Sequence, residues 1–387
     1  MTRSLLRLLC LVLLCTPLLP THAQAPVPPE VAARAYLLLD VASDQVLAER
    51  QADAQADPAS LTKLMTAWLV FDALKAKKLT LEQTLPVSLR AWSERKGGGS
   101  LMFIDTTMTP KVDELLRGMV AVSGNDAAVA LAEGVGGTLD NFVVMMNRQA
   151  QAWGLKNSKF KNVTGLTEPG HFSSARDLAL IAARIVRDFP EQYAAYYALR
   201  NYTYNAIKQD NRNMLLGRDT AVDGMKTGYT DAAGYCLVAS AQRDFPNGKR
   251  RLISVVMGAA SREARASESQ KLLNWGYTAW DAVRLFDGGK PAATVPVWKG
   301  SVPTAALGAQ RAIVVTVPKG EGDKLKTVIA RTDPLVAPLA AGQTVGALNV
   351  STSTGTQLAS VPLVVLQAVP EAGLFGRAWD SIRLWIK

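Results

Sequence analysis

Three short segments combine residue types that could carry out serine acyl transfer. Ser60 and Lys63 form Ser-x-x-Lys, Ser123 and Asn125 form Ser-x-Asn, and residues 226–228 are Lys-Thr-Gly. A serine hydroxyl is a poor nucleophile until a nearby base accepts its proton, and a neutral lysine can be that base. Because side chains three residues apart share one face of a helix, we expect the first serine and lysine to be neighbours. The segments therefore predict a serine nucleophile activated by lysine.

The other residues of these segments suit the remaining steps of such a reaction. Ser123 can relay a proton between the lysine and a leaving amine, and Asn125 can hold a substrate amide. Lys226 and Thr227 can receive a carboxylate, while Gly228 lets a substrate backbone approach the strand closely. Burial and the second lysine would both lower the pKa of the base, as its neutral form requires. An oxyanion needs backbone N–H donors, and we expect them from the nucleophile and from Tyr229.

The composition excludes several other chemistries. His171 is the one histidine outside the leader, so a Ser-His-Asp triad would have to use it. A zinc site built on several histidines or on cysteine pairs cannot be assembled. Cys236 is alone once Cys10 and Cys15 leave with the leader, so no intrachain disulfide is expected. We therefore expect neither a metal nor a cofactor.

Residues 1–25 have the features of a secretory signal peptide. Arg3 and Arg7 precede the apolar run 8–19, and residues 23–25 fit a small-x-small cleavage site. An uncleaved anchor is the alternative, although the run is too short for a comfortable membrane span. Removing the two arginines lowers the formal net charge from +10 to +8. A basic surface suits lipid headgroups, cell-wall polymers or nucleic acid. A secreted protein rarely meets nucleic acid, so we expect a membrane or cell-wall partner and no nucleic acid.

The elements that must position these residues follow from apolar periodicity. Two apolar runs around residues 42–44 predict a β-hairpin, and a long helical pattern begins at Ser60. Residues 110–190 are predicted to be mainly helical, strands return after 222, and a helix covers 268–280. This order favours a sheet covered by helices. We predict an α/β (α+β) catalytic domain over 35–283, after a linker at 26–34.

Two further parts complete the predicted organisation. Residues 284–369 are short apolar runs separated by turn residues, which predicts a small all-β domain. Residues 370–387 form an amphipathic helix that suits a membrane interface, with docking on the β-domain as the alternative. Cations lie opposite its apolar face, and Leu384 breaks the pattern. The apolar face consists of Phe375, Ala378, Trp379, Ile382, Trp385 and Ile386.

The three segments in this order, and the residues around them, resemble a known enzyme family. The matching blocks are 57–66, 100–103, 123–127, 172–177, 211–213, 222–228 and 362–367. The chain resembles the low-molecular-mass D-alanyl-D-alanine carboxypeptidases among the penicillin-binding proteins. The resemblance implies a β-lactamase/transpeptidase-like catalytic domain, a β-rich domain and a C-terminal anchor on the outer, periplasmic face of the inner membrane. It also implies removal of the terminal D-alanine from peptidoglycan stem peptides through a Ser60 acyl-enzyme, and covalent binding of β-lactam antibiotics.

The resemblance assigns further residues. Arg265 matches the position that holds the terminal carboxylate of the substrate, and Arg212 matches an arginine that braces a nearby loop. His171 becomes a loop residue without a triad role. Close relatives often have histidine after Lys-Thr-Gly, where this chain has Tyr229, so substrate preference or deacylation is expected to differ.

Three alternatives remain at this stage. A serine β-lactamase would carry Glu-x-x-x-Asn before Lys-Thr-Gly, but Glu168 is followed four residues later by Phe172. A D,D-endopeptidase of the same fold would be expected to lack the long tail. A wall-binding scaffold with a dead site would be expected to lack one of the reactive residues, and all are present.

Overall fold

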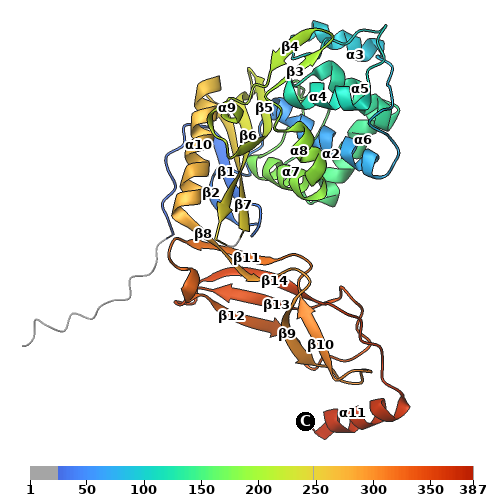
Figure 1. Ribbon diagram of the computed structural model, residues 1–387, viewed down its shortest axis with the longest axis vertical. Helices are drawn as coiled ribbons and strands as arrows, with labels where there is room; N and C mark the ends of the chain where they lie inside the picture. The colour runs from blue at the N-terminus through green and yellow to red at the C-terminus, as the bar shows by residue number, and fades with distance from the viewer. Residues whose placement is uncertain (1–24, 247, 387) are drawn as a thin grey trace, which may run out of the picture.

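The computed structural model describes residues 25–246 and 248–386, so the predicted signal peptide lies outside it except for Ala25. Figure 1 shows a domain of helices and sheet above an elongated β-domain, with a helix at the far end. The predicted fold class is confirmed. Within the described residues no single helix is long and apolar enough to cross a membrane. Helices α5 (Asn125–Gly136) and α6 (Leu139–Ala152) pass that test only together, and they are bent by 83° relative to one another.

The catalytic domain is built on a five-stranded antiparallel sheet of order β2-β1-β7-β6-β5. The predicted hairpin is confirmed, since β1 and β2 pair with Tyr36 opposite Arg50. Strand β1 also pairs with β7, far along the chain, which places β5 alone at the other edge. The strands are β1 Ala35–Asp40, β2 Val46–Arg50, β5 Val222–Thr230, β6 Gly234–Phe245 and β7 Gly248–Ala259.

The predicted covering of the sheet by helices is confirmed, and the structure places helices on both faces. Helix α10 packs on β6 and β7, while α7 packs on the opposite face and on α2. Two apolar cores result, one on each side of the sheet. The helices are α2 Lys63–Lys75, α3 Leu89–Ser93, α4 Val112–Ala121, α5 Asn125–Gly136, α6 Leu139–Ala152, α7 Ala175–Asp188, α8 Pro190–Tyr196, α9 Leu215–Arg218 and α10 Arg262–Ala279, with the 3-10 turns η1 Ala59–Thr62 and η2 Glu94–Lys96.

Two local features differ from the sequence prediction. The helix expected to begin at Ser60 starts with the 3-10 turn η1, and α2 begins only at Lys63. A hairpin of β3 Asn201–Tyr204 and β4 Ile207–Asp210 was not predicted. Its mixed polar and aromatic sequence has no continuous apolar run, which removes the main sequence signal for a strand.

The second domain is all-β, as predicted. A five-stranded sheet of order β12-β13-β14-β10-β9 packs with the pair β11-β8 around a core that includes Leu307, Val315 and Val350. Strand β8 spans the predicted domain boundary at 283/284 and pairs with β11. The elements are β8 Trp280–Phe286, β9 Pro291–Pro296, β10 Thr304–Gly308, β11 Ile313–Pro318, η3 Gly322–Lys324, β12 Lys326–Arg331, β13 Thr344–Ser351 and β14 Gln357–Val365.

Buried polar groups join the two domains. The Asp40 carboxylate forms a buried ion pair with Arg250, with 2.7 Å between Oδ2 and Nε. Thr316 of β11 donates its hydroxyl to the same carboxylate at 2.9 Å, and its hydroxyl oxygen lies 2.7 Å from that of Ser43, within hydrogen-bond distance. The Gln45 amide also bonds to the Thr316 backbone. The β1–β2 hairpin therefore provides the hydrogen bonds that hold the β-domain against the catalytic domain.

The C-terminal helix α11 covers Leu374–Ile386 and lies at the end remote from the catalytic domain (Figure 1). Its polar side contacts the β-domain: Asp380 accepts a 2.7 Å hydrogen bond from the Lys299 backbone N–H. The Arg383 guanidinium lies 5.3 Å from the Trp298 ring centroid. Leu384, which broke the predicted pattern, is half-buried together with Asp380.

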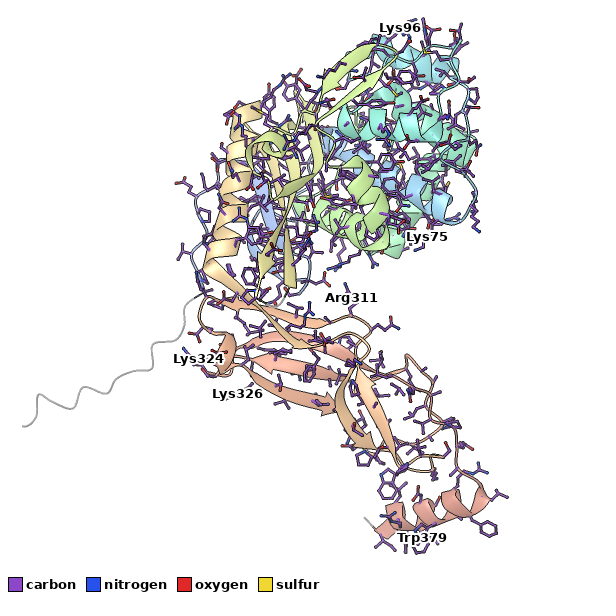
Figure 2. All side chains as sticks on the ribbon, viewed as in Figure 1. Lys75, Lys96, Arg311, Lys324, Lys326 and Trp379 are labelled. Atoms are coloured by element: carbon purple, nitrogen blue, oxygen red, sulfur yellow. The ribbon has the colours of Figure 1, made fainter. Side chains whose placement is uncertain are left out.

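The apolar face of α11 is directed away from the protein. Phe375 is 94% exposed and Trp385 is 89% exposed, values unusual for large apolar side chains. Figure 2 shows Trp379 on the outer side of this helix. Docking on the β-domain thus uses the polar side of the helix and leaves its apolar face uncovered.

Candidate active site

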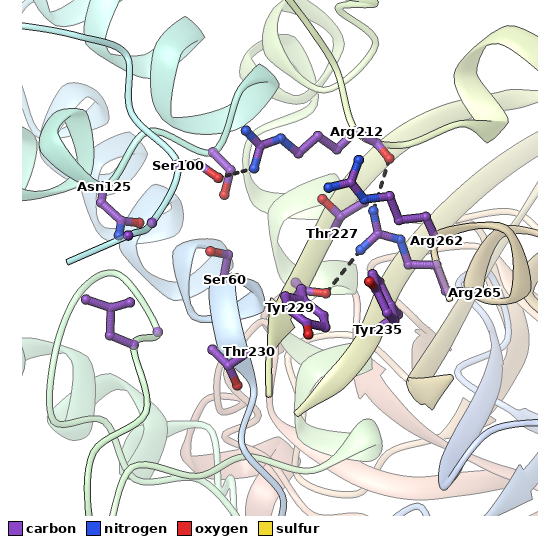
Figure 3. Close-up of a pocket in the computed structure, with 16 residues that line it drawn as sticks. Ser60, Ser100, Asn125, Arg212, Thr227, Tyr229, Thr230, Tyr235, Arg262 and Arg265 are labelled. Atoms are coloured by element: carbon purple, nitrogen blue, oxygen red, sulfur yellow. Dashed lines mark hydrogen bonds between the residues drawn. The ribbon is translucent and has the colours of Figure 1, made fainter. Parts of the chain in front are cut away.

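One cavity of about 300 Å³ is lined by most of the predicted residues (Figure 3). Lys63 and Lys226 are buried and do not line it. It lies between the helical part of the catalytic domain and the edge strand β5. None of its lining residues among the described part of the chain is an aspartate or glutamate. The lining residues are Ser60, Gly98, Gly99, Ser100, Ser123, Asn125, Gly165, Leu166, Arg212, Thr227, Gly228, Tyr229, Thr230, Tyr235, Arg262 and Arg265.

The Ser60 hydroxyl and the Lys63 amine lie 2.9 Å apart. Lys63 is buried, and its Nζ also contacts the Asn125 Oδ1 at 2.7 Å and the Thr164 carbonyl at 2.8 Å. The two carbonyl acceptors fix the direction of two N–H bonds, so the remaining position of the nitrogen faces the serine. This geometry suits either a charged amine that donates to the serine or a neutral amine that accepts its proton.

The second and third segments meet at one hydrogen bond. Lys226 donates from Nζ to the Ser123 hydroxyl at 2.8 Å and to the Thr227 carbonyl at 3.0 Å. Ser123 has a φ of 64°, in the left-handed region that a serine rarely occupies. Such a conformation persists only where its surroundings determine it. Asp126 supplies part of that support, since its carboxylate accepts hydrogen bonds from three consecutive backbone N–H groups at 102–104.

Electrostatics in the cavity favour neutral lysine. Burial lowers the pKa of Lys63 to about 7; the carboxylates of Glu94 and Asp126 oppose the shift and Arg212 adds to it. Burial also lowers the pKa of Lys226 well below its ordinary value, helped by the nearby positive charge of Lys63. Two buried amines close to one another cannot both carry a charge cheaply, so one neutral amine is available near neutral pH.

Strand β5 lies directly against the turn that carries the nucleophile. A side chain at Gly228 would come within 3.1 Å of the Pro58 carbonyl oxygen, so glycine permits this contact. Glycine at position 228 was predicted to allow close approach of the substrate backbone. The structure adds a second reason, which is the packing of β5 against the turn that carries Ser60. Tyr229 follows with its side chain exposed, and its hydroxyl donates to Asp231 at 2.8 Å.

A loop on the other side of the nucleophile is locked by His171. The buried imidazole contacts the Thr62 hydroxyl through Nε2 at 2.8 Å and accepts the Lys161 backbone N–H at Nδ1 at 3.0 Å. Burial lowers its pKa to about 4, so the ring is neutral at pH 7. It does not contact Ser60 and has no triad geometry. Gly165 in this loop has a φ of 86° and lies so close to the Ala59 carbonyl that no side chain would fit.

The arginines form the far wall of the cavity. Arg265 is buried and donates to the Gly228 carbonyl at 3.1 Å and to the Arg212 carbonyl at 3.2 Å. Arg212 donates to the Ser100 hydroxyl, which ties the β4–α9 segment to the 98–104 loop. Burial lowers the pKa of Arg265 to about 10, so it is still charged at neutral pH.

Sequence reasoning missed three participants. The Thr164 carbonyl orients the lysine, the Asp126 carboxylate supports the strained loop, and Arg262 lines the cavity. A backbone carbonyl leaves no signal in residue type, and Asp126 looks like an ordinary first-turn acid of a helix. Arg262 could have been found, because it lies three residues before Arg265 on one helix.

Comparisons with known proteins agree with this geometry. Residues 21–261 match the family model of D-alanyl-D-alanine carboxypeptidases, peptidase S11, and residues 280–371 match the C-terminal domain of penicillin-binding protein 5. The chain belongs to the S11 D-alanyl-D-alanine carboxypeptidase family. It is 42% identical over 361 residues to D-alanyl-D-alanine carboxypeptidase DacA of Escherichia coli K12, covering 92% of this chain and 88% of that protein.

Solved structures of penicillin-binding proteins share all or part of this fold. Penicillin-binding protein 5 from Haemophilus influenzae is 41% identical, with a TM-score of 0.82 over 89% of this chain and 100% of that one. Penicillin-binding protein D2 from Listeria monocytogenes in its ampicillin-bound form is 31% identical, with a TM-score of 0.56 over 65% of this chain and 100% of that one. The expected carboxypeptidase family and two-domain fold are therefore confirmed.

Proposed function

We propose that this carboxypeptidase cleaves the terminal D-Ala-D-Ala bond of peptidoglycan stem peptides through an acyl-enzyme on Ser60. The observation that carries the proposal is the 2.9 Å contact of the serine hydroxyl with the buried Lys63 amine. In the neutral state, Lys63 donates its two N–H bonds to the Asn125 and Thr164 oxygens and accepts the serine proton. The alkoxide attacks the carbonyl carbon of the penultimate D-alanine.

Two proton transfers complete acylation. The leaving amine of the terminal D-alanine needs a proton, and Ser123 supplies its own; the proton that Lys63 accepted from Ser60 then replaces it on Ser123. Lys226 bonds to Ser123 directly at 2.8 Å, which holds the hydroxyl in place. The C–N bond breaks and D-alanine leaves. A water molecule then attacks the ester, with Lys63 accepting its proton, and the freed serine regains a proton.

The remaining residues of the cavity bind the substrate. The terminal carboxylate lies against Thr227 and the Arg265 guanidinium, in a cavity that no aspartate or glutamate of the described residues lines. Asn125 holds the amide of the penultimate residue, with its Oδ1 also fixed by Lys63. Backbone N–H groups of Ser60 and Tyr229 stabilise the oxyanion, since β5 borders the nucleophile's turn.

The same serine is proposed to be acylated by β-lactam antibiotics. The ring amide presents a strained carbonyl with a carboxylate nearby, which matches the arrangement of nucleophile and cations. Deacylation is expected to be slower than in a β-lactamase, because Lys63 would have to activate the water and no carboxylate of the described residues lines the cavity to assist it. Glu168, the one candidate for a β-lactamase base, is exposed and pairs instead with Asn162 at 3.0 Å.

We further propose that α11 binds the outer face of the inner membrane from the periplasm. Its uncovered side chains are Leu374, Phe375, Trp379, Ile382, Trp385 and Ile386. An exposed apolar helix face with tryptophans and flanking cations is typical of interfacial membrane binding. The hydrogen bond between Asp380 and Lys299 fixes this face away from the β-domain, so the membrane is the surface left to cover it.

The experiment is release of D-alanine from a pentapeptide ending in D-Ala-D-Ala, by the mature protein and by Ser60→Ala. Release by the wild type alone supports the proposed reaction and nucleophile. Ser88→Ala is the matched control, because Ser88 caps α3 and does not line the cavity. Equal release by wild type and Ser60→Ala would overturn the role of Ser60, and a wild type that neither releases D-alanine nor binds labelled penicillin would overturn the enzyme proposal.

A further inference from the structure

Three guanidinium groups line the active-site cavity, although a single terminal carboxylate needs only one or two cations. They belong to Arg212, Arg262 and Arg265 (Figure 3). No aspartate or glutamate among the described residues lines the cavity. Burial lowers the pKa of Arg265, and the charges of the other two arginines contribute to the same shift. The cavity therefore carries more positive charge than the terminal carboxylate balances.

Arg262 differs from its neighbours in having no partner. Arg265 donates to two backbone carbonyls, and Arg212 donates to Ser100. Arg262 is exposed and makes no hydrogen bond or ion pair within 25–246 and 248–386. Figure 3 shows its side chain beside that of Arg265 at the upper edge of the cavity. Because no partner and no lining carboxylate for Arg262 lie within the described residues, its guanidinium is available to a ligand.

The position of Arg262 defines which part of a ligand it can reach. Residues three apart on a helix have Cβ atoms about 5–6 Å apart, so the two arginines of α10 form a pair of neighbouring anion-binding groups. The two carboxylates of one acidic amino acid can span such a gap. Tyr229 and Tyr235, with ring centroids 4.4 Å apart, line the same side and suit the methylene groups of such a side chain.

We propose that Arg262 is a specificity residue that binds a carboxylate on the side chain of the leaving D-amino acid. The inference rests on the proposed function, in which Arg265 holds the α-carboxylate of the same residue. The enzyme then accepts stem peptides ending in D-Ala-D-Glu better than those ending in the uncharged isostere D-Ala-D-Gln. The reaction is unchanged: the amide bond breaks and the acidic D-amino acid leaves.

The test compares blocked tripeptides ending in D-Ala-D-Glu, D-Ala-D-Gln and D-Ala-D-Ala with the full-length mature protein and Arg262→Gln. The readout is the ratio of kcat/KM for D-Glu to that for D-Gln, which cancels any general loss of activity. We expect a ratio of about five in the wild type and about one in the variant, the size of a partly exposed ion pair. Lys271→Gln is the matched control: it lies on the same helix, outside the cavity, pairs with Glu268, and removes the same charge.

Two results would overturn the inference. A wild-type ratio of one would mean that the site does not distinguish the charged side chain. An equal ratio in wild type and Arg262→Gln would assign any preference to the general positive field of the cavity. Failure of the proposed function is distinguishable, because then the wild type would not release D-alanine from the D-Ala-D-Ala peptide either.

Discussion

The catalytic cavity and helix α11 depart from the usual distribution of side chains in opposite directions. Lys63, Lys226 and Arg265 are basic side chains that are buried, whereas Phe375 and Trp385 are large apolar side chains exposed to solvent. Burying a charged or polar group is costly unless it has a partner, and each of these three side chains has two or more hydrogen bonds. The exposed apolar side chains of α11 have no contacts within the described part of the protein that would offset the cost of their exposure to water.

Because of this difference, the active site and helix α11 should respond differently to single substitutions. In the cavity, function depends on contacts of less than 3 Å, so a single substitution should be decisive. On α11, membrane binding depends on apolar area, which adds over several side chains. Loss of one residue there should weaken binding gradually.

The largest expected effect is in the cavity. Replacing Lys63 with methionine keeps the volume of the side chain and removes the base, so kcat/KM for D-alanine release should fall by about a thousandfold or more. Circular dichroism checks that the fold is kept. Lys75→Met, in the last turn of the same helix and exposed, is the control. A loss of less than tenfold in kcat/KM would contradict the view that the active site depends on single contacts, because the contact of Lys63 with Ser60 would then be dispensable.

The next effect is on α11. Trp379→Ser combined with Trp385→Ser should weaken binding to vesicles of phosphatidylethanolamine and phosphatidylglycerol by about a hundredfold, with each single change weakening it by about tenfold. Flotation or sedimentation measures the bound fraction, and D-alanine release should stay at the wild-type rate. Val328→Ser, exposed on the β-domain, is the control. Unchanged vesicle binding by the double variant would refute the proposed anchor.

A smaller, graded effect is expected from pH. Because the pKa of Lys63 is lowered to about 7, the fraction of neutral amine rises with pH until about 7 and then levels off. The rate of acylation should therefore fall about tenfold for each pH unit below 7. Glu94→Gln removes a carboxylate that raises this pKa, so the acid limb should move to lower pH; Glu82→Gln, an exposed acid, should not move it. An acid limb identical in both variants would contradict the assignment to Lys63.

The smallest effect concerns the junction between the two regions. Thr316→Val removes the hydroxyl that bonds to Asp40 and should lower the free energy of unfolding by about 1–2 kcal/mol, as loss of one buried hydrogen bond does. Urea unfolding measures it, with Thr327→Val on the exposed face of β12 as the control. Equal stability of the two variants would show that this junction adds nothing to folding.

Local patterns in the sequence determined the secondary structure and the spacing of the reactive residues in much of this protein. The spacing of Ser60 and Lys63 placed nucleophile and base on adjacent turns, and the apolar periodicity of 374–386 defined the amphipathic helix. Turn residues separated the strands of the β-domain. These features depend on interactions between residues a few positions apart, so the sequence alone carries them.

The tertiary structure decided what depends on contacts between distant segments. It placed β1 beside β7, directed the Thr164 carbonyl to Lys63, and brought Lys226 to Ser123. It also decided which side of α11 docks, because Asp380 finds its partner at Lys299 in another domain. Burial lowers the pKa of Lys63, and burial exists only in the folded chain. For that reason the sequence could identify Lys63 as the candidate base, whereas the lowered pKa that lets it act as a base depends on the folded structure.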